Sequence, residues 1–404
     1  MKKIMITMML VIAVVTASAQ TKRLRLNESR AMHASALPSV SRLDQRSRQL
    51  FDFGWQFTHN GTTQTVDLPH DWDIFEGPNS GQGVTGTGGG WFEAGKGEYR
   101  KTFKTPGDKL VKLHFEGVYQ KAEVYVNGQR AGQHHYGYTP FTVDVTKYLN
   151  KDKKQANEVV VKVDNSEQPN CRWYSGSGIY RHVWLETMPA LHIAENGVFV
   201  TTPEVSSDKA RVQVDVTVQN ESQTDRNATV VVGSAQLMVA VKAGESKTVT
   251  TTLFVNNPRL WSPDSPTLYE AKVELKEAGN VIDNATAKYG IRTFSFDAEN
   301  GFVLNGQKVL INGARVHHDD GVLGAMAFDD AEIRKVRQMK EAGFNLIRTS
   351  HNPTTRAFLD ACDSFCTVTS TCTRAWSALT SGVVTKTPFS AMCSAGIVSS
   401  HTWR

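Results

Sequence analysis

Two short polar stretches carry the side chains that could do chemistry. One reads Gly-Ala-Arg-Val-His-His-Asp-Asp-Gly over residues 313–321, and the other reads Arg-Thr-Ser-His-Asn-Pro over residues 348–353. Two histidines and two aspartates within four residues could ligate a metal ion, because imidazole and carboxylate are common metal ligands. Adjacent residues on one loop do not all face a single ion, however, and the sequence offers no further ligand cluster. A ligand-binding wall and a loop without chemistry are the other interpretations.

The residues between these two stretches have the pattern of a helix. Asp329 can cap its N-terminus, and Glu332 stands three residues later, which is the spacing of a capping box. Gly343 is typical of the residue that ends a helix. Apolar residues recur at every third position and predict one face packed on a sheet: Ile333, Val336, Met339 and Ala342.

A strand, a helix and a second strand follow one another here. Residues 344–349 predict the second strand, and the unit of about thirty residues indicates the start of a parallel β/α barrel. In such barrels the loops after the strands carry the chemistry. We therefore expect His317 and His351 to lie side by side, each just after one of two adjacent strands.

The Arg-Thr-Ser-His-Asn-Pro stretch resembles a strand-end motif of glycoside hydrolase family 2, the group of β-galactosidases and β-glucuronidases. The resemblance extends over residues 45–363. In that family the histidine of this motif and the histidine of the preceding strand end contact the sugar. The resemblance thus implies substrate-binding roles for His317 and His351, with Arg348 and Asn352 supporting that wall. Asp320, in the first of the two stretches, is a further substrate-binding candidate that could hydrogen-bond the sugar or orient a histidine.

Residues 45–190 alternate short strands with turns, which favours a β-sandwich or jelly roll. Aromatic residues at 51, 53, 55 and 57 predict one buried strand face, and Asn127-Gly128 predicts a hairpin turn. The Gly-rich stretch 81–90 lacks the Lys-Ser/Thr ending of a phosphate loop and is interpreted as a flexible surface crossing.

The segment 170–181 is similar to the end of the sugar-binding domain of that family, which reaches the barrel mouth. The resemblance implies that Arg172 makes a polar contact to the sugar. Other members often have Asp at this position. The alternative is that Arg172 and two aromatic residues cover an edge of the sandwich.

Residues 191–293 predict an immunoglobulin-like sandwich without its disulfide. Valines at 212, 214, 216 and 218 alternate with polar residues, as in a half-buried strand. This stretch also resembles the middle domain of the family, to which we assign no chemistry. Trp261 is interpreted as a core residue.

The chain ends carry different signals. Residues 1–19 have a basic start, an apolar run and a final Ala-Ser-Ala, which is the pattern of a secretory signal peptide cut after Ala19. This predicts a periplasmic or secreted protein, and no Cys follows the cut to suggest a lipid anchor. The expected organisation is multidomain β plus α/β: signal peptide 1–19, leader 20–44, jelly-roll sugar-binding domain 45–190, immunoglobulin-like sandwich 191–293, first units of a (β/α)8 TIM barrel 294–363, and a non-family tail 364–404.

The chemistry that the resemblance implies requires acids that this sequence does not contain. Retaining glycosidases use two carboxyl groups about 5–5.5 Å apart, and in this family both are Glu on later barrel strands. Here Glu341 is the last Glu, Asp363 is the last acid, and residues 364–404 hold three of the five Cys. A whole barrel takes about 250 residues. A reading-frame shift after Asp363 is our hypothesis, and the catalytic residues are predicted to be absent.

Composition excludes some partners and leaves three functions open. The chain of 404 residues is 40% apolar, with a net charge of +5 and no basic block that would indicate nucleic-acid binding. The Cys spacing indicates neither a disulfide framework nor a zinc site. The candidates are a β-galactosidase-type hydrolase acting on terminal β-linked glycosides, a carbohydrate-binding remnant, and an exported structural sandwich protein. No cofactor is predicted, although the intact family could bind a divalent or sodium ion, and the oligomeric state is not indicated.

Overall fold

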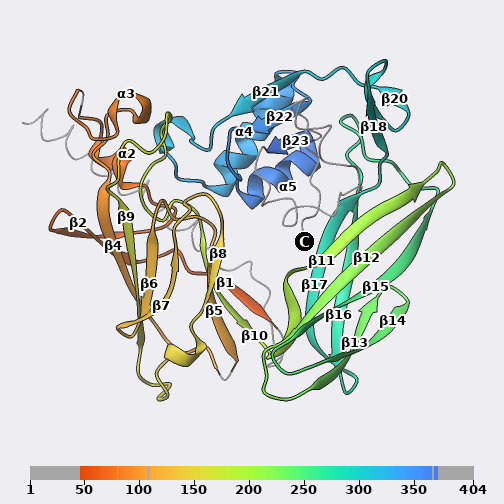
Figure 1. The fold of residues 1–404 in the computed structure, drawn as a ribbon, viewed down its shortest axis with the longest axis horizontal. Coiled ribbons are helices and arrows are strands. Elements are labelled where there is room, and N and C mark those ends of the chain that lie inside the picture. Colours follow the sequence, from red (N-terminus) through yellow and green to blue (C-terminus); the bar gives the residue numbers. More distant parts are fainter. Residues whose placement is uncertain (1–45, 80, 108, 366–367, 372–404) are drawn as a thin grey trace, which may run out of the picture. The chain divides into compact units, whose positions relative to one another are not determined.

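The computed structural model describes residues 46–79, 81–107, 109–365 and 368–371 (Figure 1). The predicted signal peptide, the leader and most of the predicted tail lie outside the described residues. The described chain forms a jelly roll, an immunoglobulin-like sandwich and part of a TIM barrel, which is the expected fold class. Among the described residues, no helix is long and apolar enough to cross a membrane.

The first domain is two antiparallel sheets facing one another, with strand orders β1-β10-β5-β8 and β3-β2-β4-β9-β6-β7. Alternate residues of β5 and β9 are fully buried because successive side chains of a strand point to opposite faces. The elements are β1 (Ser47–Leu50), β2 (Trp55–His59), β3 (Thr62–Val66), α2 (Trp72–Glu76), α3 (Gly86–Gly89), β4 (Gly95–Phe103), β5 (Leu110–Phe115), β6 (Ala122–Val126), β7 (Gln129–His134), β8 (Phe141–Asp144), η1 (Thr146–Tyr148), β9 (Asn157–Asn165) and β10 (Val183–Met188).

Of two local predictions in this domain, the hairpin turn is confirmed and the buried strand face is wrong at one residue. Asn127 and Gly128 both have positive φ and join β6 to β7, so the predicted hairpin is confirmed. The predicted strand face at residues 51–57 is wrong at Phe53, which is 55% exposed. The reason is a turn: Gly54 has a φ of 75°, and β2 begins only at Trp55.

The Gly-rich stretch 81–90 lies largely at the surface, as a surface crossing would, and part of it has regular local structure. It contains the short helix α3, and Thr85 donates to and accepts from the backbone of Phe92. Glycine is required at position 83, and Gly88 makes a tighter approach than most side chains allow. A Cβ on Gly83 would lie 1.7 Å from the carbonyl oxygen of Trp91, and one on Gly88 would lie 3.2 Å from Cα of Arg172.

The second domain is a sandwich of the sheets β11-β12-β15 and β14-β13-β16-β17, and all its pairings are antiparallel. The alternating valines of β12 are fully buried, as predicted, and form the centre of its core. Trp261 is also buried, beside Phe302 and Leu304. The elements are β11 (Leu191–Val205), β12 (Lys209–Asn220), β13 (Arg226–Val232), β14 (Ala235–Val241), β15 (Ser246–Asn256), β16 (Leu268–Glu277) and β17 (Asn280–Gly290).

The third domain has a small antiparallel sheet and then a parallel sheet of order β21-β22-β23. Helices α4 and α5 share one small core with β22 (Figure 1). The parallel sheet continues past Asp363, the residue at which the first barrel units were predicted to end. The elements are β18 (Phe294–Asp297), β19 (Gly301–Leu304), β20 (Gln307–Lys308), β21 (Gly313–Val316), η2 (Gly321–Leu323), α4 (Asp329–Glu341), β22 (Leu346–Thr349), α5 (Arg356–Phe365) and β23 (Val368–Thr371).

The predicted capping box of α4 is absent. The N-cap is Phe328, no side chain caps the helix, and Asp329 is its first residue. The side chain of Asp329 instead lies 3.4 Å from Nε2 of His182 in the jelly roll. Glu332 is buried and lies 3.5 Å from Lys335. A tertiary partner thus pairs with Asp329, whereas Glu332 pairs with Lys335 of the same helix.

Candidate functional site

The two predicted histidines lie together at the carboxyl edge of the parallel sheet. Strands β21 and β22 pair in parallel with Val316 opposite Thr349, so the residues that follow them leave the sheet side by side. The ring centroids of His317 and His351 are 6.1 Å apart and the ring planes are almost perpendicular. The expected adjacency of these residues is confirmed.

A tryptophan from the jelly roll completes this group of rings. The ring centroid of Trp173 lies 5.3 Å from that of His317 and 5.5 Å from that of His351. Its indole nitrogen donates to the hydroxyl of Tyr138. We define the histidine-tryptophan wall as Trp173, His317 and His351. Two domains therefore build one wall, and sequence reasoning missed its aromatic member.

The histidines of the wall offer nitrogen atoms to a ligand. Burial lowers the pKa of His351, and the neighbouring groups Arg348, His317, Arg315 and Arg172 lower it further. A neutral imidazole has one donor and one acceptor nitrogen. Nδ1 of His317 is buried and has no hydrogen-bond partner within the described residues. The wall can therefore both donate to and accept from hydroxyl groups.

Asn352 is oriented by the jelly roll. The hydroxyl of Tyr136 donates to its Oδ1 over 2.8 Å, which assigns the amide orientation and leaves Nδ2 as a donor. That Nδ2 atom is buried without a hydrogen-bond partner in the described part of the chain. Asn352 thus adds a donor beside the wall.

The three charged residues that we predicted for the site lie in different surroundings. Arg348 lies on β22 opposite Arg315 of β21, and Arg172 is exposed on its loop. Both lower the pKa of His351 and so act on the wall through their charge. Asp320 lies 2.9 Å from Lys335 of α4, in an ion pair in which both side chains are largely buried. The structure therefore places Asp320 against the helix, whereas Arg172 and Arg348 are linked to the wall through charge alone.

The second histidine of the first stretch faces inward. Nε2 of His318 lies 3.1 Å from the backbone carbonyl of Ser175, and burial lowers the pKa of His318 to about 3. It is therefore neutral at ordinary pH and joins the two domains. In the described part of the chain, no three His, Cys, Asp or Glu side chains are arranged to hold a metal ion.

Arg181 fixes the loop that carries His351 and Asn352. Its guanidinium donates to the carbonyl of Pro353 over 2.9 Å and to that of Tyr138 over 3.2 Å. The side chain is almost fully buried, so these bonds hold a barrel loop on the jelly roll without competition from water. Sequence reasoning had assigned Arg181 no role.

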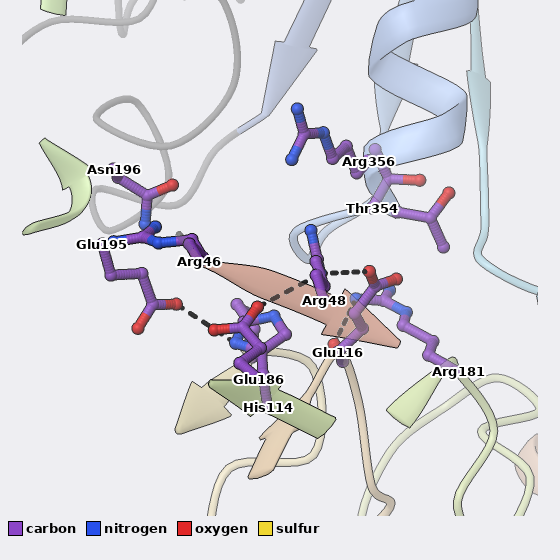
Figure 2. A pocket seen from close by; sticks show the side chains of 12 residues that line it. Arg46, Arg48, His114, Glu116, Arg181, Glu186, Glu195, Asn196, Thr354 and Arg356 are labelled. Atoms are coloured by element: carbon purple, nitrogen blue, oxygen red, sulfur yellow. Dashed lines mark hydrogen bonds and ion pairs between the residues drawn. The ribbon is translucent and has the colours of Figure 1, made fainter. Parts of the chain in front are cut away.

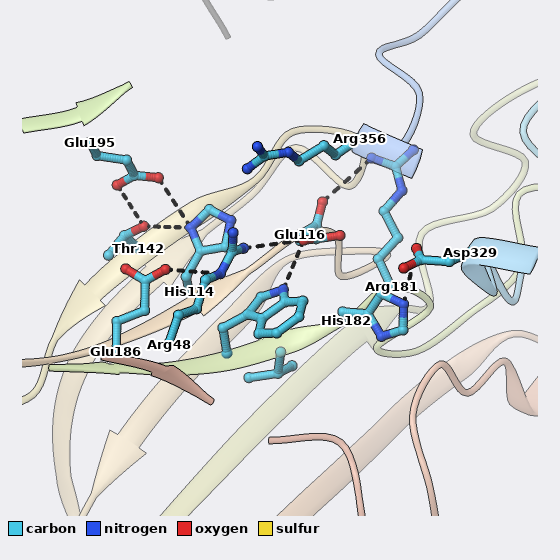
Figure 3. Close-up of polar contacts among 12 residues, drawn as sticks. Arg48, His114, Glu116, Thr142, Arg181, His182, Glu186, Glu195, Asp329 and Arg356 are labelled. Atoms are coloured by element: carbon cyan, nitrogen blue, oxygen red, sulfur yellow. Dashed lines mark hydrogen bonds and ion pairs between the residues drawn. The ribbon is translucent and has the colours of Figure 1, made fainter. Parts of the chain in front are cut away.

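A cavity of about 180 Å³ lies beside this loop, where the three domains meet (Figure 2). Its charges are largely paired: Arg48 lies 3.1 Å from Glu186 and 3.3 Å from Glu116, and His114 lies 3.1 Å from Glu195 (Figure 3). These ion pairs indicate that the cavity is a junction between domains. The cavity is lined by Arg46, Arg48, His114, Glu116, Pro140, Arg181, Glu186, Glu195, Asn196, Thr354, Thr355 and Arg356.

Three models of one enzyme family match the chain in consecutive order. The sugar binding domain of glycosyl hydrolases family 2 matches residues 91–189, the model called glycosyl hydrolases family 2 matches 191–292, and the family's TIM barrel domain matches 298–376. The last match begins near the boundary that we predicted at 294 and runs past the one at 363.

Individual relatives agree with these matches. The β-galactosidase BoGH2A of Bacteroides ovatus is 40% identical over 353 residues, which are 81% of this chain and 41% of that protein. A β-glucuronidase of Formosa agariphila is 30% identical over 379 residues, 80% of this chain and 38% of that protein. The crystal structure of a family 2 member from Bacteroides cellulosilyticus has a TM-score of 0.72 and 36% identity, and covers 80% of this chain and 45% of that one. The chain spans less than half the length of each.

Proposed function

This chain belongs to glycosyl hydrolase family 2, and from that premise we propose that it recognises the terminal sugar of a β-linked glycoside of the β-galactoside type. The homologues are glycosidases named β-galactosidase or β-glucuronidase. The similarity to the β-galactosidase of Bacteroides ovatus supports the first of these two substrate classes.

The observation that carries the proposal is the histidine-tryptophan wall. A flat indole face can pack on the C–H face of a sugar ring, while two imidazoles and the Asn352 amide can hydrogen-bond its hydroxyl groups. Binding sites of this kind combine aromatic surface with a few placed polar groups. The jelly roll and the barrel would each supply one side of the same sugar subsite.

We further propose that the 404 residues bind a β-glycoside without cleaving it. Retaining hydrolysis needs a nucleophile and an acid/base on two carboxyl groups about 5–5.5 Å apart. Residues 364–404 contain no Asp or Glu. Asp320 and Glu332 are both held by Lys335, so neither is positioned as a nucleophile. A protein of this sequence would recognise the sugar, whereas hydrolysis would need a pair of carboxyl groups that residues 364–404 do not supply.

The test measures binding and turnover separately on the purified 404-residue chain. We expect methyl β-galactoside to shift the imidazole signals of His317 and His351 in nuclear magnetic resonance spectra. Nitrophenyl β-galactoside should not be hydrolysed above the rate of a matched preparation from cells that carry the empty vector. Turnover at an ordinary enzymatic rate would overturn the non-catalytic part, and unchanged histidine signals would overturn the recognition part. Methyl β-glucuronide in the same titration tests the substrate class.

Export is a separate part of the proposal. The signal pattern of residues 1–19 supports delivery to the periplasm or outside the cell. N-terminal sequencing of the mature protein should begin at Gln20. A mature protein that begins at Met1 would contradict export through this signal.

A further inference from the structure

A buried carboxylate bonds to both loops that carry the histidine-tryptophan wall. Asp71 is the N-cap of α2 and is fully buried. Its Oδ1 accepts hydrogen bonds from the backbone N–H groups of Asp73, at 3.2 Å, and Ser177, at 2.9 Å. Its Oδ2 accepts from the hydroxyl of Tyr174 and from the N–H of Ala325, the latter at 2.8 Å. One side chain therefore joins three separate segments of the chain.

Two of these segments carry the wall. Tyr174 and Ser177 belong to the loop that presents Trp173, and Ala325 belongs to the loop that follows β21 and His317. Both loops approach Asp71 very closely. A Cβ on Gly176 or on Gly324 would lie 2.6 Å from Oδ2 of Asp71. The approach is therefore possible only because both positions are glycine.

The chemistry of the cluster requires a carboxylate. All four partners of Asp71 are donors, and an ionised carboxylate is an acceptor at both oxygens. An Asn side chain has the same shape but would point an N–H₂ group at N–H or O–H donors. Burial raises the pKa of Asp71, and the hydrogen bonds from Tyr174, Ala325, Ser177 and Asp73 oppose that rise. Within the described chain Asp71 has no ion pair, so these hydrogen bonds stabilise its charge.

We propose that Asp71 is a positioning residue that holds Trp173 against His317 and His351. It touches neither the sugar nor the rings, and it acts through the two loops that it joins. The consequence for sugar binding rests on the proposed function, whereas the position of the rings does not. The two can therefore be tested apart.

The experiment compares Asp71→Asn, Tyr174→Phe and Asp283→Asn in the full chain. Asp283 is the control, because it is also fully buried and accepts backbone N–H bonds, from Ile193 and Asn284, in the second domain; unlike Asp71, it also pairs with Arg46. The first readout is the chemical shift of the His317 and His351 imidazole signals without sugar, since the nearby indole ring displaces them. The second readout is the affinity for methyl β-galactoside.

We expect Asp71→Asn to move both imidazole signals and to weaken sugar binding about tenfold, the effect of losing a hydrogen bond to a charged group. Tyr174→Phe should move the signals in the same direction by less, and Asp283→Asn should leave them in place. Signals that stay in place in both Asp71→Asn and Tyr174→Phe overturn the proposal. Tyr174→Phe decides alone if Asp71→Asn does not fold. If the wild-type chain binds no sugar, the proposed function fails while the imidazole shifts still test Asp71.

Discussion

At the scale of single residues, the wall depends on pairs of side chains that lie far apart in the sequence. His317 and His351 could be predicted because their positions follow from the order of strands. Trp173 could not be selected, because its neighbours in the same loop are also aromatic or charged and nothing local says which of them reaches the barrel. Asp320 carried the right chemistry for a ligand, but Lys335 of the following helix is its partner.

Removing the indole should weaken recognition while the fold remains. Trp173→Ala is expected to reduce the affinity for methyl β-galactoside by about fivefold, because one aromatic contact contributes on the order of 1 kcal/mol. Isothermal titration measures this change. Trp184→Ala is the control, since Trp184 stacks on Arg48 in another part of the jelly roll. An equal loss in both variants would contradict a specific role for Trp173.

The stability of the chain should depend on the protonation of Asp73. Burial raises the pKa of Asp73 to about 7, and the charge of Asp71 acts in the same direction. The folded chain then holds a proton that the unfolded chain releases near pH 4, so this residue makes the free energy of unfolding fall as the pH rises from about 4 to 7. Asp73→Asn should make that fall less steep, by at most about 1.4 kcal/mol per pH unit. Urea unfolding at pH 5 and pH 7 checks this, and parallel curves for the two proteins would contradict it.

At the scale of elements, strands with one buried face were the easiest to predict. The valines of β12 alternate with polar residues, and this period of two indicates a strand with one buried face. The N-terminus of α4 was harder. Asp329 and Glu332 have the spacing of a cap, yet Asp329 lies beside His182 of the jelly roll and Glu332 lies beside Lys335 of the same helix. The local sequence contains the cap signal and Lys335, but it does not show that His182 lies beside Asp329.

The contact between α4 and the jelly roll should be sensitive to alkaline pH. Nδ1 of His182 lies 2.6 Å from Asp52, and its ring lies beside Asp329 (Figure 3). Burial lowers the pKa of His182, but the hydrogen bonds and charges of Asp329 and Asp52 outweigh it and raise the pKa to about 10. The stabilisation is therefore fully present below about pH 6.5 and is lost as the pH rises through 10.

His182→Gln tests this contact. At pH 6.5 we expect it to lower the free energy of unfolding by roughly 3 kcal/mol, because it leaves the buried Asp52 carboxylate without its cation. The difference from wild type should shrink as the pH approaches 10.5. Asp329→Asn should act in the same direction with a smaller effect, since Asp329 is mostly exposed. A difference that does not change with pH would show that the charge of His182 is not involved.

At the scale of the whole molecule, three domains of different autonomy follow one another. The two sandwiches have their own large cores of buried side chains. The parallel sheet has a small core, shared by α4, β22 and α5. The order of the domains could be predicted because turns and strand periods change along the chain. The contacts between them could not, because Arg181, Asp71 and His318 are ordinary polar residues in any local pattern.

Isolated fragments should reflect this difference. Residues 191–293 are expected to unfold cooperatively on heating, while residues 295–404 should show no cooperative transition and should aggregate. A parallel sheet normally buries both faces, and β21 and β23 end the described sheet with unpaired edges. Calorimetry and circular dichroism of the two fragments measure this. A sharp transition in residues 295–404 would contradict the expectation.

The wall is split between a loop of the jelly roll and the strand ends of the barrel, and this limits how freely the domains can be exchanged. A chimera that joins this jelly roll to a foreign barrel would inherit Trp173 but would also need a glycine where Gly324 meets Asp71. Recombination at the domain border alone would thus break the subsite. Transferring the sugar preference to another protein requires the jelly-roll loop and the barrel strand ends to be transferred together.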